Sequence, residues 1–130
     1  MKQQIAQFTI VVADYDEAIS FYAGKLGFQL LEDTPLSAEK RWVRVAPPGN
    51  SGCAILLAKA AGEQQQAAVG NQTGGRVGFF LHTDDFERDY SRLLQNGVKI
   101  IRPPATHPYG QVAVFADLYG NLWDLVEPAT

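Results

Sequence analysis

The sequence predicts an α+β fold of two βαβββ modules in tandem. Three observations indicate this. The order of strand-like and helix-like segments repeats along the chain, and the residues that begin and end the helices recur in register. The third observation is a segment rich in Ala, Gln and Gly, residues 60–75, which lacks a hydrophobic period. We therefore expect one domain, with module one at about 5–59, a connector at 60–75 and module two at 76–128.

The first series begins with a β-branched run. In residues 5–12, alternate apolar side chains share one strand face, and the polar Gln7 and Thr9 lie on the other. Asp14 is the expected N-cap of a helix, with a glutamate three residues on, and Gly27 ends that helix. Three further strands are expected at 28–31, 41–46 and 53–58.

The second series repeats this pattern after the connector. A strand at 77–81 precedes a helix that is expected to start at Asp84 and to stop at Gly97. Both residues lie 70 positions after their counterparts, Asp14 and Gly27. The remaining strands are expected at 98–101, 111–116 and 122–127, with a turn at 117–121 between the last two.

Composition and charge exclude several classes of function. The 130 residues are 46% hydrophobic, which is ordinary for a globular protein, and the net charge of -3 comes without a basic stretch, which argues against nucleic acid as a partner. The short N-terminal apolar run matches neither a secretory signal nor a membrane span, so we expect a cytoplasmic protein with no membrane partner. Cys53 is the only cysteine, and a packed thiol is the simplest interpretation.

One carboxylate in the last expected strand needs an explanation. Asp124 alternates with Leu122 and Val126, so its neighbours on the same strand face are apolar. A carboxylate that points inward must be paired, hydrogen-bonded or bound to a cation. Asp124 is therefore a candidate site residue, and the alternative is a strand residue that faces solvent.

These features together resemble the vicinal oxygen chelate superfamily, which includes glyoxalase I, extradiol dioxygenases and the bleomycin-binding proteins. The resemblance is carried by FYAGKLGF at 21–28, by TDD at 83–85 with NGV at 96–98, and by YGNLWDL at 119–125. It covers nearly the whole chain. It implies that the curved mixed sheets of the two modules form a glyoxalase-like cup for a small molecule, usually in a homodimer.

The resemblance also implies where a metal would bind in this family, at the first and the last strand of each module. These four positions fall on Gln7, Leu56, Gly78 and Asp124. Leu56 and Gly78 have no side-chain donor, whereas a transition metal requires several N, O or S ligands. We therefore expect no metal and no other cofactor, and we expect the same positions to contact a small-molecule ligand.

Strand alternation adds further candidates. Phe80 and His82 share one strand face, and Thr9 shares one with Gln7, which predicts a mixed aromatic and polar lining near Asp124. His82 is a candidate proton carrier together with Asp124. The alternative is that His82 is a rim residue with local hydrogen bonds.

Three more residues are candidate ligand contacts. Arg44 alternates with Trp42 on one strand, a pair that suits a flat anionic ligand, and the alternative is a solvated outer face. His107 and Tyr109 are expected in a loop beside Gly110, where exposure is the default and a role over the mouth of the cup is the second interpretation.

Two classes of function remain open. A binding protein would hold a small molecule in the cavity between the two modules, with Asp124 as an anionic anchor and without a metal. The alternative is an enzyme of the same superfamily, a metal-dependent or metal-free lyase, isomerase or dioxygenase. In its metal-free form Asp124 and His82 would carry protons. The missing metal ligands favour the binding protein.

Overall fold

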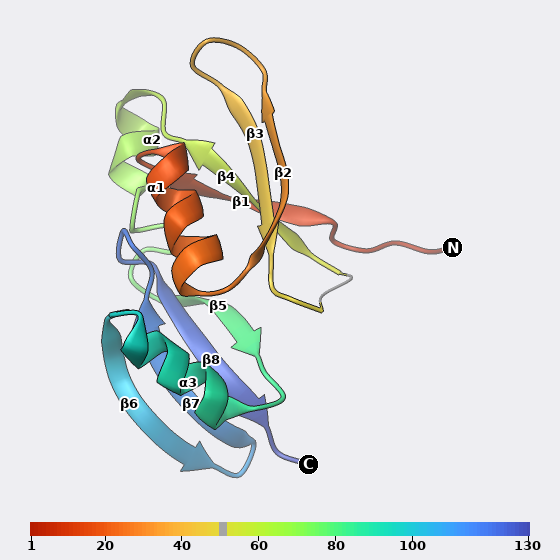
Figure 1. Cartoon of the computed structure of the whole chain (residues 1–130), viewed down its shortest axis with the longest axis vertical. Helices are drawn as coiled ribbons and strands as arrows, with labels where there is room; N and C mark the ends of the chain where they lie inside the picture. The colour runs from red at the N-terminus through yellow and green to blue at the C-terminus, as the bar shows by residue number, and fades with distance from the viewer. Residues whose placement is uncertain (50–51) are drawn as a thin grey trace. The chain divides into compact units, whose positions relative to one another are not determined.

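The fold is α+β, as predicted, and its two halves repeat the order βαβββ (Figure 1). The computed structural model describes residues 1–49 and 52–130, which form two compact units, Met1–Val69 and Gly70–Thr130. Each unit contains one four-stranded sheet. Both sheets are mixed, because in each of them one pair of strands is parallel and the others are antiparallel.

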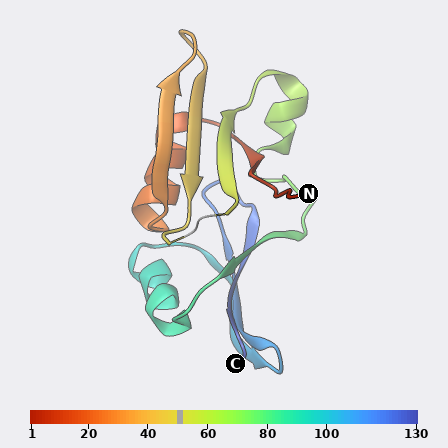
Figure 2. The ribbon, with the colours of Figure 1, turned by 90° about the vertical axis from the view of Figure 1, so that its right-hand side faces the viewer.

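The first unit contains sheet A, whose strand order is β1-β4-β3-β2. Its strands are β1 (Gln7–Val12), β2 (Gln29–Pro35), β3 (Arg41–Ala46) and β4 (Ala54–Lys59). Strand β1 runs parallel to β4, and Figure 2 shows β2, β3 and β4 side by side. The strand predicted at 41–46 has the observed bounds, while the other strands differ by a few residues at their ends. Sequence patterns determine the ends of an element less well than its existence.

The helical segment of the first unit begins at the predicted cap. The Asp14 carboxylate accepts the Glu17 backbone N–H at 2.9 Å, which satisfies one of the free donors of the first turn. Helix α1 (Tyr15–Ile19) then continues as η1 (Ser20–Lys25), a wider helical turn that ends before Gly27, whose φ is 77°. Buried side chains of this segment form the unit's core with alternate residues of β1, β3 and β4: Tyr15, Ala18, Phe21, Tyr22, Ile10, Val12, Val43, Val45, Ile55 and Leu57.

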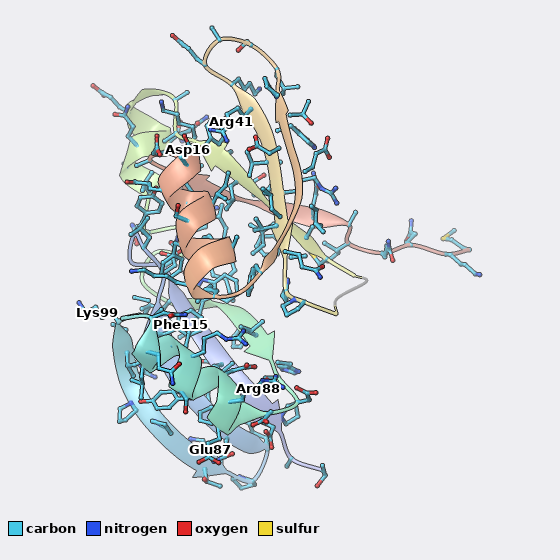
Figure 3. All side chains as sticks on the ribbon, viewed as in Figure 1. Asp16, Arg41, Glu87, Arg88, Lys99 and Phe115 are labelled. Atoms are coloured by element: carbon cyan, nitrogen blue, oxygen red, sulfur yellow. The ribbon has the colours of Figure 1, made fainter. Side chains whose placement is uncertain are left out.

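An arginine ties the helix of this unit to the β2–β3 hairpin. The Arg41 guanidinium lies 2.8 Å from an Asp16 carboxylate oxygen and 2.7 Å from one of Asp33. Figure 3 shows Arg41 next to Asp16 at the start of the helix. Because these side chains are partly exposed, the two ion pairs fix geometry more than they add stability.

The second unit contains sheet B, whose strand order is β5-β8-β7-β6. Its strands are β5 (Val77–His82), β6 (Ile100–His107), β7 (Gly110–Ala116) and β8 (Leu122–Pro128). Helix α3 (Phe86–Gln95) lies across β7 and β8 in Figure 1. Its buried Phe86 and Leu93 belong to the same core as the Trp123 ring, which packs on Phe79 and Phe115.

The start of α3 differs from the prediction. Asp85, and not Asp84, is the N-cap: its carboxylate accepts the Arg88 backbone N–H at 3.1 Å. The Thr83 hydroxyl accepts the Asp85 backbone N–H, which fixes the turn before the helix, and Asp84 pairs with the Arg88 side chain at 2.9 Å. An N-cap is the residue whose side chain accepts a hydrogen bond from the N–H of the third helical residue. Two consecutive acids, Asp84 and Asp85, have nearly the same spacing to the helix, so spacing alone did not select the right one.

Two further expectations are corrected at the edges of the fold. His107 was expected in a loop, yet it is the last residue of β6, where it pairs with Gly110. Pro103 and Pro104 lie inside β6 because it is an edge strand with a register shift between Arg102 and Ala105, where proline's missing N–H is tolerated.

The connector between the two series includes a short helix. This is helix α2 (Gly62–Ala68), which contacts β1 of the first unit. Among the described residues, no helix is long and apolar enough to cross a membrane.

Candidate functional site

Each sheet has one face against its helix and a second face turned away from it, here called the distal face. In sheet B the helix face is identified by the buried Trp123 and Leu125, and by Glu127, whose carboxylate accepts the Phe86 backbone N–H at 2.7 Å. Since side chains alternate along a strand, Asp124 lies on the distal face. The same alternation in sheet A places the fully buried Ile10 on the helix face and Thr9 on the distal face.

On sheet A the strand register aligns four residues across the distal face, here called row A. In the order β1, β4, β3, β2 they are Thr9, Leu56, Arg44 and Glu32. The Arg44 Nε donates to Gln7 Oε1 at 2.9 Å, and an Arg44 terminal nitrogen lies 3.6 Å from Glu32 Oε1. The charge of Arg44 is therefore balanced by neighbours within its own sheet.

On sheet B the equivalent residues form row B. In the order β5, β8, β7, β6 they are Phe80, Asp124, Val114 and Arg102. Phe80 is 63% exposed although it is a large apolar residue, whereas Val114 is buried. Neighbouring strands lie about 4.8 Å apart, so the Phe80 ring and the Asp124 carboxylate are direct neighbours on one face.

The Asp124 carboxylate is half-buried. Burial raises the pKa of Asp124 above its usual value, and the positive charge of Arg102 opposes this rise. Within the part of the chain that the structure describes, neither a hydrogen bond nor an ion pair reaches this carboxylate. The positive charge that acts favourably on it from the described residues is that of Arg102, two strands away in the row.

The other predicted site residues lie at different places. His82 pairs in register with Val126 and therefore lies on the same distal face as Phe80. It is exposed there. The rings of His107 and Tyr109 stack with their centroids 5.1 Å apart at the β6–β7 turn, and both residues are exposed. These two residues therefore form one stacked pair of exposed rings at this turn.

Gly78 lies at a register shift in β5 and has no room for a side chain. A Cβ added there would come within 2.3 Å of Thr73 Cγ2, in the segment before β5. Thr73 is held in place by its hydroxyl, which donates to the Arg76 carbonyl at 2.6 Å. This packing explains the glycine without a ligand.

The structure groups the predicted residues into two sets and adds one residue that the sequence analysis missed. Gln7, Thr9, Arg44 and Leu56 come together on sheet A, and Phe80, His82 and Asp124 come together on sheet B. Arg102 was missed because the strand was expected to end at residue 101. Extending the strand by one residue would not have been enough, because the register shift between Ile100 and Arg102 reverses the alternation: Ile100 pairs with Phe115 on the helix face, and Arg102 pairs with Val114 on the distal face.

The residues at the four positions implied for a metal do not fit one. Gln7 Oε1 already accepts a hydrogen bond from Arg44, Leu56 has no donor atom, and Gly78 is covered by Thr73. No group of three or more His, Cys, Asp or Glu side chains that could hold a metal ion occurs among residues 1–49 and 52–130. A single carboxylate is a poor transition-metal site.

Comparison with family models gives one match over most of the chain. The model of the "Glyoxalase/Bleomycin resistance protein/Dioxygenase superfamily" matches residues 4–125. A relative from Shewanella frigidimarina (strain NCIMB 400), described as an uncharacterised protein, is 56% identical over 128 residues, which is 98% of this chain and 95% of the relative.

Solved structures with the same fold are also similar in sequence. UcmS2 has a TM-score of 0.85 and 32% identity, and the match covers 98% of this chain and 99% of that one. TnmS3, described as an antibiotic binding protein from Streptomyces sp. CB03234, has a TM-score of 0.79 and 31% identity over 98% of each chain.

Proposed function

The chain belongs to the glyoxalase/bleomycin resistance protein/dioxygenase superfamily, and from this premise we propose that it binds a small organic molecule on the distal faces of its sheets, without a metal centre. The observation that carries this proposal is row B, where a carboxylate without a hydrogen-bond partner among the described residues stands next to a largely exposed phenyl ring. Both features cost free energy in the free protein, and a ligand that covers them would recover part of it.

The comparison with TnmS3 supports a binding role. That protein is described as antibiotic binding, and 31% identity over 98% of both chains makes a related ligand-binding use of the same fold reasonable. We therefore extend small-molecule binding to this chain, with Gln7, Thr9 and Arg44 as further ligand contacts on sheet A.

The second candidate is an enzyme of the same superfamily, a lyase, isomerase or dioxygenase. The observation that favours it is the raised pKa of Asp124, caused by burial, together with His82 on the same distal face. A carboxyl of this kind is a better proton carrier at neutral pH than an exposed one. The donor set at the implied metal positions argues against the metal-dependent form.

Two measurements separate these candidates. Native mass spectrometry and thermal shift with a small-molecule library should detect ligands that stabilise the wild type and not Asp124→Asn. The control is Glu63→Gln, which removes an exposed carboxylate from α2. Turnover of the hemithioacetal of methylglyoxal and glutathione, or stoichiometric metal that Asp124→Ala abolishes, would overturn metal-free binding in favour of the enzyme.

We also propose that the protein acts as a homodimer in the cytoplasm, in line with the family resemblance. Light scattering during size-exclusion chromatography should give twice the 14.2 kDa chain mass. A monomer at micromolar concentration would contradict the dimer.

A further inference from the structure

Asp124 and Phe80 together describe the kind of ligand that row B would accept. The carboxylate offers a negative charge, and the ring beside it offers a flat apolar surface with a negative face. Buried Val114 and Val126 lie next to Asp124 on the same distal face and form an apolar floor. This combination of groups attracts a cation with an apolar body.

We propose that row B selects organic cations: molecules with one protonated nitrogen on a flat, apolar body. This inference rests on the proposed function and names the class of ligand for the same site. The protonated nitrogen would pair with the Asp124 carboxylate, and the apolar body would lie on the Phe80 ring. A half-buried carboxylate pairs more strongly with a cation than an exposed one does, because water screens the contact less.

Arg102 at the far end of the row sets the orientation of such a ligand. It lies on β6, two strand spacings or roughly 10 Å from Asp124 on β8. At this distance its charge disfavours a second positive group on the ligand, while a neutral or negative group is accepted there. The row therefore fits a molecule that is positive at one end only.

Row A explains why this selection belongs to the second unit. There the equivalent of Asp124 is Leu56, and the charges of the row, Arg44 and Glu32, lie 3.6 Å from each other. A cation would gain little from this row, because Glu32 is already engaged by Arg44 and is partly exposed.

A set of three flat probes of similar size tests the inference: 9-aminoacridine, which is positive at neutral pH, acridine, which is neutral, and acridine-9-carboxylate. Affinities are measured by calorimetric or fluorescence titration. The wild type should bind the amine at least about tenfold more tightly than acridine, equivalent to about 1.4 kcal/mol. Asp124→Asn should reduce this ratio to about one, and Asp124→Glu should keep it.

Matched variants separate the charge contact from the ring contact. Phe80→Ala should weaken both acridine and the amine, and the amine more, because its positive charge is spread over the flat body that lies on the Phe80 ring, whereas Glu63→Gln should change neither. If acridine and its carboxylate bind as tightly as the amine, or if Asp124→Asn keeps the preference, the inference is wrong while small-molecule binding stands. If the wild type binds no probe and no member of the library, both proposals are wrong.

Discussion

Rows A and B occupy equivalent places in two sheets of the same topology, yet their charges are arranged differently. In row A, Arg44 is on the third strand of the row and lies within 3.6 Å of Glu32 on the fourth, and Leu56 is apolar. In row B the acid is on the second strand, the arginine is on the fourth, and Val114 lies between them. The repeated backbone thus carries one row whose charges are matched internally and one whose charges are kept apart.

The largest expected effect is in the turn that precedes Asp124. The buried Asp117 carboxylate accepts the backbone N–H groups of Tyr119, Gly120 and Asn121 and the Asn121 side-chain amide, at 2.9–3.0 Å. Asp117→Ala should lower the free energy of unfolding by about 3 kcal/mol, because the N–H groups of Tyr119 and Gly120 and the buried N–H groups of Asn121 lose their acceptor. Urea denaturation measures the total loss.

Hydrogen exchange shows whether that loss is confined to one unit. If the two units are energetically separate, protection should fall in Gly70–Thr130 and persist in Met1–Val69. Equal loss of protection in both would show that the units unfold together, which would weaken any unit-by-unit comparison.

The next largest effect is a difference in stability between variants of the two row arginines, Arg44 and Arg102. Arg44→Met should cost about 1 kcal/mol, because Gln7 and Glu32 lose their partner. Arg102→Met should change stability by less than about 0.5 kcal/mol, since Arg102 is exposed and has no ion pair among the described residues. Chemical denaturation of both variants tests the contrast, and equal costs would contradict it.

Asp124→Asn should stabilise the free protein at pH 7 by less than about 1 kcal/mol. Burial raises the pKa of Asp124 in the folded state, so ionisation costs stability above the folded pKa. This cost shrinks as the pH falls from the folded pKa toward the unfolded value of 3.8, below which both states are protonated. The gain measured in denaturation curves should therefore disappear at low pH.

Asp33→Asn should destabilise the protein, the opposite of the effect of Asp124→Asn, and this change in stability should be the smallest of those predicted. The hydrogen bond from Arg41 holds the pKa of Asp33 below its usual value, so its contribution is present above the unfolded pKa of 3.8 and is lost as the pH falls through the folded pKa. At pH 7 the variant should lose a few tenths of a kcal/mol, because the pair is partly exposed. A gain in stability at pH 7 would contradict this account.

Local sequence patterns predicted the elements better than the site. The α+β repeat follows from strand alternation and from glycines such as Gly27 and Gly97, whose φ values of 77° and 72° end the helical segments. Asp124, Phe80 and Arg44 could be selected in the same way, because alternation alone assigns their faces.

Register could not be predicted, because it depends on contacts between residues far apart in the chain. The pairing of Arg44 with Gln7 and Glu32, and the place of Arg102 in row B, appear only once the strands are aligned. The cap at Asp85 was missed for a similar reason, since two adjacent acids compete and the turn geometry selects one.

Strand β8 carries an acid on each of its two faces, and this arrangement allows events on one face to be followed by NMR from the other. Asp124 belongs to row B, while three residues later Glu127 accepts the Phe86 backbone N–H at 2.7 Å, in the first turn of α3. A small displacement of β8 along its axis would change that hydrogen bond. The amide resonance of Phe86 can therefore serve as a remote reporter of events at Asp124, read from a nucleus that touches no ligand.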